Sequence, residues 1–219
     1  MIRFVFILML MSSYSMSQSS YQLAVLKYQG GGDWYANPSS LKNLAIFCNQ
    51  NLNMNISKEY DIVTPSSQEL FNYPYIYMTG HGNVLFSDSD VLNLRKYLKG
   101  GGFLHIDDNY GMDQYIRTEM KKIFPDIDFI ELPKEHEIYN NIYELKNGLP
   151  KIHEHDNKPA QGLALIYRNK IVCFYSYESD LGDGWEDANV HKDPEYIRRE
   201  SLKMGANILA YVMNPNSIK

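Results

Sequence analysis

The segment at residues 73–108 has the sequence YPYIYMTGHGNVLFSDSDVLNLRKYLKGGGFLHIDD, which predicts a strand, a helix and a second strand in succession. Residues 73–78 and 102–106 are short apolar runs, as is typical of strands covered on both faces. The helix is expected at residues 88–99, where Ser87 and Asp90 form a capping box and Gly100 marks the end. The segment therefore predicts one β–α–β unit.

The same alternation extends over the rest of the chain. Strands are expected at residues 22–28, 61–64 and 128–132, and helices at residues 38–52, 114–124 and 194–213. Residues 162–168 and 170–177 predict a hairpin that turns at Asn169. The predicted fold class is α/β, with a doubly wound, mostly parallel sheet and an added antiparallel hairpin. Residues 133–161 are interpreted as an excursion of the same domain.

The composition is that of a globular protein with a substantial core. Of the 219 residues, 44% are hydrophobic and 21% are charged, which excludes collagen-like and disordered chains. The formal net charge is -5, so a nucleic acid would have to bind against the overall field of the protein. We therefore expect no nucleic-acid partner.

The N-terminal residues predict export. Arg3 is followed by an apolar run at residues 4–11 and then by small and polar residues up to Ser17. This pattern is typical of a secretory signal peptide at residues 1–17, and the apolar run is too short to span a membrane. We expect a periplasmic or secreted protein without stable membrane insertion after cleavage, in which residues 18–219 form one domain.

The two cysteines are interpreted as packing residues. Cys48 follows Leu41, Leu44 and Ala45 at the spacing of a buried helix face, and Cys173 lies within an apolar strand. An exported chain with an even number of cysteines can also form a disulfide, so a bridge between these two thiols stays open.

Polar and glycine-rich loops follow several of the predicted strands, at residues 30–35, 79–83, 107–111 and 178–191. In open α/β sheets, ligands bind beyond the carboxyl ends of the strands, so we expect these loops to converge on a ligand site. The candidate ligand-binding residues are Gly31, Gly32, Asp33, Trp34, Tyr35, Gly80, Gly82, Asn109, Tyr110, Asp183, Trp185, Glu186 and Asp187.

Two of these features have structural alternatives. Trp34 and Trp185 could stack on sugar rings, because aromatic faces bind apolar sugar faces, or they could serve in packing alone. The glycines before Asp33 could cradle an anion at a helix N-terminus. A simple turn is the alternative, and Asp33 would repel phosphate.

Asp107 and Asp108 are the candidate catalytic carboxylates, together with His81. They directly follow a predicted strand, so one can face the cleft while its neighbour turns toward a helix N-terminus. A cleft carboxylate could act as a general base or pair with an acidic residue of the loop at residues 178–191. The alternative is that both are hydrogen-bonded turn residues.

His153 and His155 are the candidate metal ligands. One residue separates them, so on an extended segment both imidazoles point to the same side and could share a divalent metal. His81 or an aspartate would complete the coordination. The alternative is a pair of histidines that bond only to backbone carbonyls. The cofactor is thus unknown, and a divalent metal is the candidate that these residues suggest.

Several motifs together resemble the bacterial family known as domain of unknown function 4159. The likeness covers residues 21–214 and is carried by YQGGGDWY at 28–35, GHG at 80–82, DDNYG at 107–111, LPKIHEH at 149–155 and DLGDGWED at 180–187. That family looks like a branch of the class I glutamine amidotransferase-like, flavodoxin-like fold. The resemblance therefore implies an α/β architecture, without an established activity.

The resemblance also implies that the glutaminase reaction is absent. In glutamine amidotransferases a cysteine nucleophile follows the strand that here ends at Ile106, and Asp107 and Asp108 occupy that place. The turn at residues 80–82 resembles the oxyanion-hole loop of that fold. A pocket is thus expected to persist without the thiolate that the glutaminase reaction needs.

Two functions follow from these observations. The first is an exported domain that binds a small molecule or a glycan, such as a cell-envelope fragment, at the carboxyl edge of the sheet. The second is a hydrolase of an envelope carbohydrate or amide, in which carboxylates or a bound metal activate water. The sequence leaves the oligomeric state open.

Overall fold

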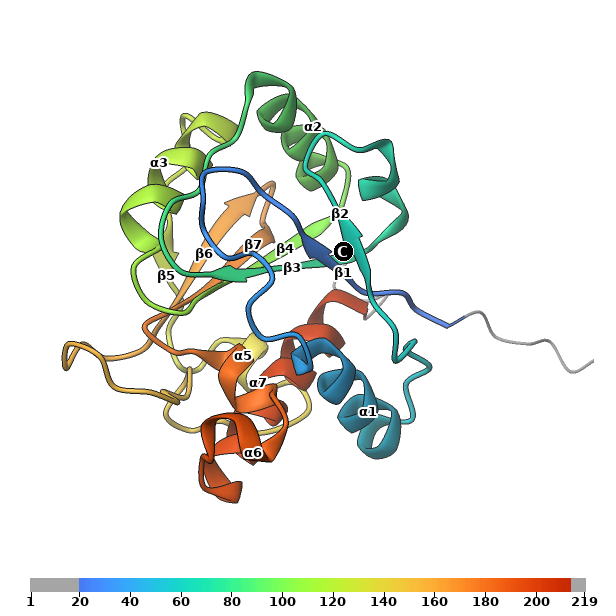
Figure 1. Cartoon of the computed structure of the whole chain (residues 1–219), viewed down its shortest axis with the longest axis vertical. Coiled ribbons are helices and arrows are strands. Elements are labelled where there is room, and N and C mark those ends of the chain that lie inside the picture. Colours follow the sequence, from blue (N-terminus) through green and yellow to red (C-terminus); the bar gives the residue numbers. More distant parts are fainter. Residues whose placement is uncertain (1–19, 214–219) are drawn as a thin grey trace, which may run out of the picture.

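The central sheet of the computed structural model, which describes residues 20–213, has the strand order β2-β1-β3-β4-β7-β6-β5 (Figure 1). The parallel strands are β2 (Asp61–Val63), β1 (Ala24–Leu26), β3 (Tyr75–Gly80), β4 (Phe103–Asp108) and β7 (Lys170–Tyr177). The antiparallel edge consists of β6 (Gln161–Tyr167) and β5 (Ile130–Glu131). The predicted α/β fold, with its mostly parallel sheet and added hairpin, is confirmed.

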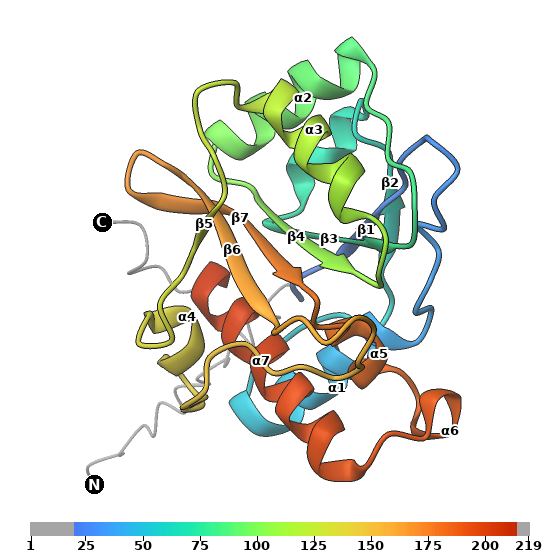
Figure 2. The same ribbon diagram turned by 90° about the vertical axis from the view of Figure 1, so that its left-hand side faces the viewer.

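Helices cover both faces of the sheet, as Figure 2 shows from the side. One face carries α2 (Asp88–Lys99) and α3 (Asp113–Ile123), and the other carries α1 (Ser40–Leu52), α5 (Leu181–Trp185) and α7 (Glu195–Met213). Successive side chains of a strand point to opposite faces, so β3 contributes to both cores. Ile76 belongs to the first core, as does Leu94, and Tyr77 belongs to the second, as does Leu44.

The two cysteines lie in these cores as free, buried thiols. Cys173 belongs to the cluster beneath α2 and α3, whereas Cys48 belongs to the cluster beneath α1 and α7. The packing role predicted for both is therefore confirmed.

Two local signals in the sequence correspond to the observed structure. Ser87 and Asp90 form the capping box that begins α2, because each side chain accepts a backbone N–H of the other. The β6–β7 hairpin turns at Arg168 and Asn169, whose φ angles of 51° and 62° are those of a type I′ turn.

Short helices occur where loops were expected. They are η1 (Gln68–Asn72), α4 (Glu137–Asn140), α5 and α6 (Ala188–His191). An element of four or five residues is too short to display a helical period, so the pattern of the sequence did not predict these helices.

The signal peptide predicted at residues 1–17 lies outside the described residues. Within the described part of the chain, no helix is long and apolar enough to cross a membrane.

Candidate functional site

The carboxyl ends of β3, β4 and β7 are adjacent, because Gly80 pairs with Asp108 and Asp107 pairs with Ser176. The connections that follow these strands meet two further segments at this edge, residues 33–37 and residues 151–158. The predicted convergence of loops is therefore observed, and it gathers aspartates and histidines from distant parts of the sequence.

Asp107 is fully buried at the end of β4. Its carboxylate accepts hydrogen bonds from Ser176 Oγ at 2.6 Å, Tyr77 Oη at 2.9 Å and the backbone N–H groups of Leu181 and Gly182 at 3.1 and 2.6 Å. Burial raises the pKa of Asp107 to about 7, and the hydrogen bonds from Ser176 and Gly182 oppose that shift. This carboxylate therefore fixes the start of α5 against β4.

Asp108 performs a similar role on the other face of the sheet. It accepts the backbone N–H of Met112 at 3.0 Å and the hydroxyl of Tyr175 at 3.0 Å, which holds the connection to α3. Burial raises the pKa of this carboxyl as well. Both residues predicted to be catalytic thus hold structural hydrogen bonds as the last two residues of β4. A catalytic role for either stays a prediction.

His81 lies on the exposed turn after β3 and contacts Asp33. Its backbone N–H donates to Asp33 Oδ1 at 2.5 Å, and its Nδ1 lies 3.0 Å from Asp33 Oδ2. These bonds lower the pKa of Asp33 although partial burial acts in the opposite direction. Gly80 has a φ angle of 136°, and a Cβ there would overlap the hydroxyl of Tyr28, so this turn requires glycine.

The loop at residues 30–35 packs against that turn through the backbone N–H of Gly32, which donates to the carbonyl of Asn83 at 3.0 Å. Its aromatic residues differ in exposure. Tyr35 is 66% exposed, and Trp34 is partly buried with the ammonium of Lys27 5.2 Å from its ring centre. Both rings are at least partly accessible to a ligand, and the turn glycines Gly31 and Gly82 have open space beside them.

Asn37, which the sequence analysis did not single out, joins two of these loops. Its Nδ2 donates to Asp183 Oδ1 at 2.5 Å, and its Oδ1 accepts from Asn109 Nδ2 at 2.5 Å. Asn109 in turn accepts the hydroxyl of Thr79 at 3.2 Å. A continuous chain of polar side chains therefore leads from the end of β3 to Asp183.

A cluster of histidine and carboxylate side chains surrounds Asp183. His153 Nδ1 lies 2.9 Å from Asp183 Oδ2, and His191 Nε2 lies 3.6 Å from Asp183 Oδ1. The other ring nitrogen of His153 lies 3.1 Å from Asp193 Oδ1. Hydrogen bonding to Asp183 raises the pKa of His153 to about 9, against the effect of burial. His153, Asp183 and His191 each offer one atom within 4.8 Å of the other two, which is a potential metal site.

His155 lies beside this group but is not one of its three members. Its Nε2 is 2.5 Å from Asp180 Oδ2, and its ring stacks on Tyr110 with 4.5 Å between the ring centres. Asp180 Oδ2 also lies 3.7 Å from His153 Nδ1. The other oxygen of Asp180 is buried and has no hydrogen-bond partner among the described residues.

The chain matches one known protein family over nearly all of its described residues. A family model described as Domain of unknown function (DUF4159) matches residues 22–213. The chain belongs to the DUF4159 family. The resemblance drawn from the motifs is therefore confirmed, and the match spans every strand and every loop of the candidate site. No curated protein matches the chain.

The last motif of this DUF4159 domain, at residues 180–187, is mainly structural. Trp185 is fully buried and donates its indole N–H to the carbonyl of Ser201, so it presents no ring face to a ligand in this structure. Glu186 accepts the backbone N–H and the hydroxyl of Ser39 at 2.8 and 2.9 Å, next to the start of α1. Asp187 accepts Asn43 Nδ2 at 2.9 Å. Among these motif residues, Asp180 and Asp183 face the histidine cluster.

Sequence reasoning missed the residues that complete the cluster. His191 and Asp193 carry no motif spacing relative to His153, since 38 and 40 residues separate them in the sequence. The available signal was topological: the connection after β7 returns to the same edge of the sheet as the segment before β6.

Proposed function

We propose that this DUF4159 domain is an exported carbohydrate-binding domain that holds a divalent transition-metal ion at the carboxyl edge of its sheet. The observation that carries the proposal is the group formed by His153, Asp183 and His191, whose potential ligand atoms lie within 4.8 Å of one another. Two imidazoles and one carboxylate are ligands suited to zinc and similar ions.

The ligand atoms of the group, which lie within 4.8 Å of one another, would have to adjust to the spacing of a tetrahedral site. Bonds of 2.0–2.2 Å from zinc place neighbouring ligand atoms about 3.3 Å apart. His153 Nδ1 lies 2.9 Å from Asp183 Oδ2, and His191 Nε2 lies 3.6 Å from the other oxygen, Oδ1, so side-chain rotations would have to direct both imidazoles and one carboxylate oxygen toward the ion. Binding would displace the proton that the neighbouring carboxylates favour on His153.

Neighbouring residues provide the supporting contacts that metal ligands need. Asp193 lies 3.1 Å from the second nitrogen of His153, in the position of a carboxylate that orients a ligating imidazole. Asn37 holds Asp183 Oδ1 and leaves Oδ2 toward His153. Both contacts reduce the freedom of the ligands before an ion arrives.

The surroundings of the cluster favour a carbohydrate as the ligand. Three protein ligands leave a coordination position for a hydroxyl or carboxylate oxygen of a bound molecule. The segment that supplies Asn37 also carries the accessible rings of Trp34 and Tyr35, and aromatic faces bind apolar sugar faces. A sugar could thus engage the ion and the aromatic rings together.

One observation favours a second candidate function, a metal-dependent hydrolase of an envelope carbohydrate or amide. A site with three protein ligands and an open position is the arrangement of catalytic zinc. The buried Oδ1 of Asp180 lacks a partner beside this site, so Asp180 is better placed than Asp107 or Asp108 to contact a metal-bound water.

A glycan array probed with the zinc-loaded protein and with the same protein in EDTA tests the first function. We expect binding that requires the metal, is lost in His153→Ala/His191→Ala and is weakened at least tenfold in Trp34→Ala. His136→Ala is the matched histidine control and should bind as the wild type does. Binding that persists in EDTA and in the His153→Ala/His191→Ala variant would contradict the proposal. Chemical conversion of the bound glycans would assign the domain to the hydrolase class instead.

Export is the second part of the proposal, and the sequence pattern of residues 1–17 supports it. Fractionation of the source cells followed by N-terminal sequencing tests it. We expect mature protein that begins near Gln18 in the periplasmic or secreted fraction. Intact protein that retains Met1 in the cytoplasmic fraction would overturn this part.

A further inference from the structure

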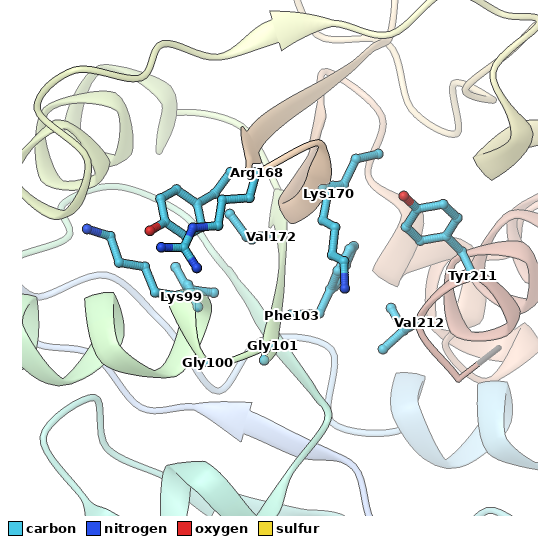
Figure 3. Close-up of a pocket in the computed structure, with 13 residues that line it drawn as sticks. Lys99, Gly100, Gly101, Phe103, Arg168, Lys170, Val172, Tyr211 and Val212 are labelled. Atoms are coloured by element: carbon cyan, nitrogen blue, oxygen red, sulfur yellow. The ribbon is translucent and has the colours of Figure 1, made fainter. Parts of the chain in front are cut away.

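A cavity of about 430 Å³ opens at the amino ends of β4 and β7, at the opposite end of the sheet from the candidate metal site. Figure 3 shows the side chains that line it. It lies where β4 begins at Phe103 and β7 begins at Lys170, next to the hairpin turn and the C-terminal part of α7. The metal cluster follows the other ends of these strands. This cavity is therefore a separate feature of the fold.

Three cationic side chains line the cavity, and its lining contains no aspartate or glutamate. Lys99 comes from the end of α2, while Arg168 and Lys170 come from the hairpin turn (Figure 3). Among the described residues, no carboxylate lies within ion-pair distance of these three cations. A local positive field thus arises in a protein whose net charge is -5.

An aromatic ring holds two of these cations at the cavity. The ammonium of Lys99 and the guanidinium of Arg168 each lie 5.2 Å from the ring centre of Tyr167. Cation–π contacts of this kind orient a cation and leave its hydrogen-bond donors free for an incoming anion.

The remaining walls of the cavity are apolar or lack side chains. Phe103, Ile171, Val172 and Val212 provide hydrocarbon surface, and residues 100–102 are glycines. A volume of this size is in the range of small-molecule pockets, which combine apolar walls with a few polar groups that fix orientation. The lining thus suits a ligand that has both an apolar body and a negative charge.

We propose that this cavity binds a free amphipathic anion, in which a phosphate or similar anionic group is attached to an apolar body. The anionic group would contact Lys99, Arg168 and Lys170, and the apolar body would pack on Phe103 and its aliphatic neighbours. This site is independent of the metal cluster and of the proposed carbohydrate function.

Titration calorimetry of the full protein with 1-naphthyl phosphate tests the proposal. We expect one saturable site, with 1-naphthol and inorganic phosphate each binding at least tenfold more weakly because they lack one half of the ligand. The change Arg168→Gln/Lys170→Gln should weaken binding at least tenfold. The control Lys42→Gln/Lys58→Gln removes the same charge from exposed positions elsewhere and should leave binding unchanged.

Several results would overturn the proposal. The wild type could fail to bind 1-naphthyl phosphate at millimolar concentration, 1-naphthol could bind equally well, or the Arg168→Gln/Lys170→Gln variant could retain full affinity. A separate arm measures sedimentation with phosphatidylglycerol vesicles. Vesicle binding that depends on Arg168 and Lys170, without binding of 1-naphthyl phosphate, would identify a membrane lipid as the source of the anion and would overturn the proposal of a free ligand.

A further variant tests the shape of the cavity. Val212→Trp narrows the cavity without a change of charge, so it should also reduce the affinity for 1-naphthyl phosphate.

Discussion

Asp107 accepts the backbone N–H of Gly182 at 2.6 Å, and this bond joins the end of β4 to the first turn of α5. The residue after Gly182 is Asp183, the central carboxylate of the proposed metal site. Asp107 therefore positions the loop that carries Asp183.

Replacement of Asp107 by asparagine should destabilise the fold. In either orientation, the asparagine N–H₂ group would face one backbone N–H group, which cannot reverse its direction, and one hydroxyl. We expect a loss of about 3 kcal/mol in the free energy of unfolding, measured by urea denaturation. Asp187→Asn, at an exposed position, is the control and should change stability by less than about 0.5 kcal/mol. A stable Asp107→Asn protein that loses a hydrolytic activity would instead support a catalytic role for Asp107.

Gly182 has no room for a side chain. A Cβ at this position would overlap the hydroxyl of Tyr77 and lie 2.9 Å from Asp107 Oδ2. We expect Gly182→Ala to lower the free energy of unfolding by about 2 kcal/mol. Removal of the hydroxyl in Tyr77→Phe should relieve part of the overlap, so the double variant should be more stable than the sum of the single effects predicts. Strict additivity of the two changes would contradict this interpretation.

Stability should fall at acidic pH partly because of His105. This residue is fully buried between Tyr75 Oη and Ser176 Oγ, and burial lowers its pKa to about 3. The unfolded chain binds a proton at an ordinary pKa of about 6.5, so unfolding takes up a proton between these two values. The contribution of His105 is therefore complete above pH 6.5 and is lost as the pH falls toward 3. The slope from this residue approaches about 1.4 kcal/mol per pH unit.

Urea denaturation at pH 7, 6, 5 and 4 measures this effect by comparison with His105→Gln. Glutamine retains hydrogen-bonding groups but has no titrating ring, so the difference in stability between the two proteins should shrink as the pH falls. A difference that is constant from pH 7 to pH 4 would show that His105 does not carry this pH dependence.

The two tryptophans should respond differently to a soluble quencher. Trp185 is fully buried, whereas Trp34 is partly exposed in the loop at residues 30–35. We expect iodide to quench the wild type partially and Trp34→Phe hardly at all, with emission of that variant at shorter wavelength. Strong quenching of Trp34→Phe would show that the ring of Trp185 reaches solvent and is available to a ligand.

Local signals predicted the elements of this fold well, because each depends on neighbouring residues. Ser87 and Asp90 are three residues apart and determine the start of α2, and Asn169 marks the hairpin turn. The extension of β4 through Asp108 was not predicted, because an aspartate at the end of a strand resembles a loop residue in sequence. The hydrogen-bond partners of Asp107 and Asp108, among them Ser176 and the backbone of Met112, are brought to them only by the fold.

The candidate site was predicted in outline but not in its pairings. The rule that strand ends converge correctly brought the loops at residues 79–83, 107–111 and 178–191 together. It could not pair Asn37 with Asp183, which lie 146 residues apart, or place His191 beside His153. Such contacts depend on the paths of irregular loops, which sequence periodicity does not encode.

Elemental analysis of the purified protein, prepared without a metal-binding tag and dialysed after loading with zinc, tests the central claim most directly. We predict about one zinc per chain in the wild type and in Cys48→Ala, and none in His153→Ala/His191→Ala. We further predict that His155→Ala retains the ion, because His155 contacts Asp180 rather than the three proposed ligands. No retained zinc in the wild type, or equal zinc in the wild type and His153→Ala/His191→Ala, would contradict the account.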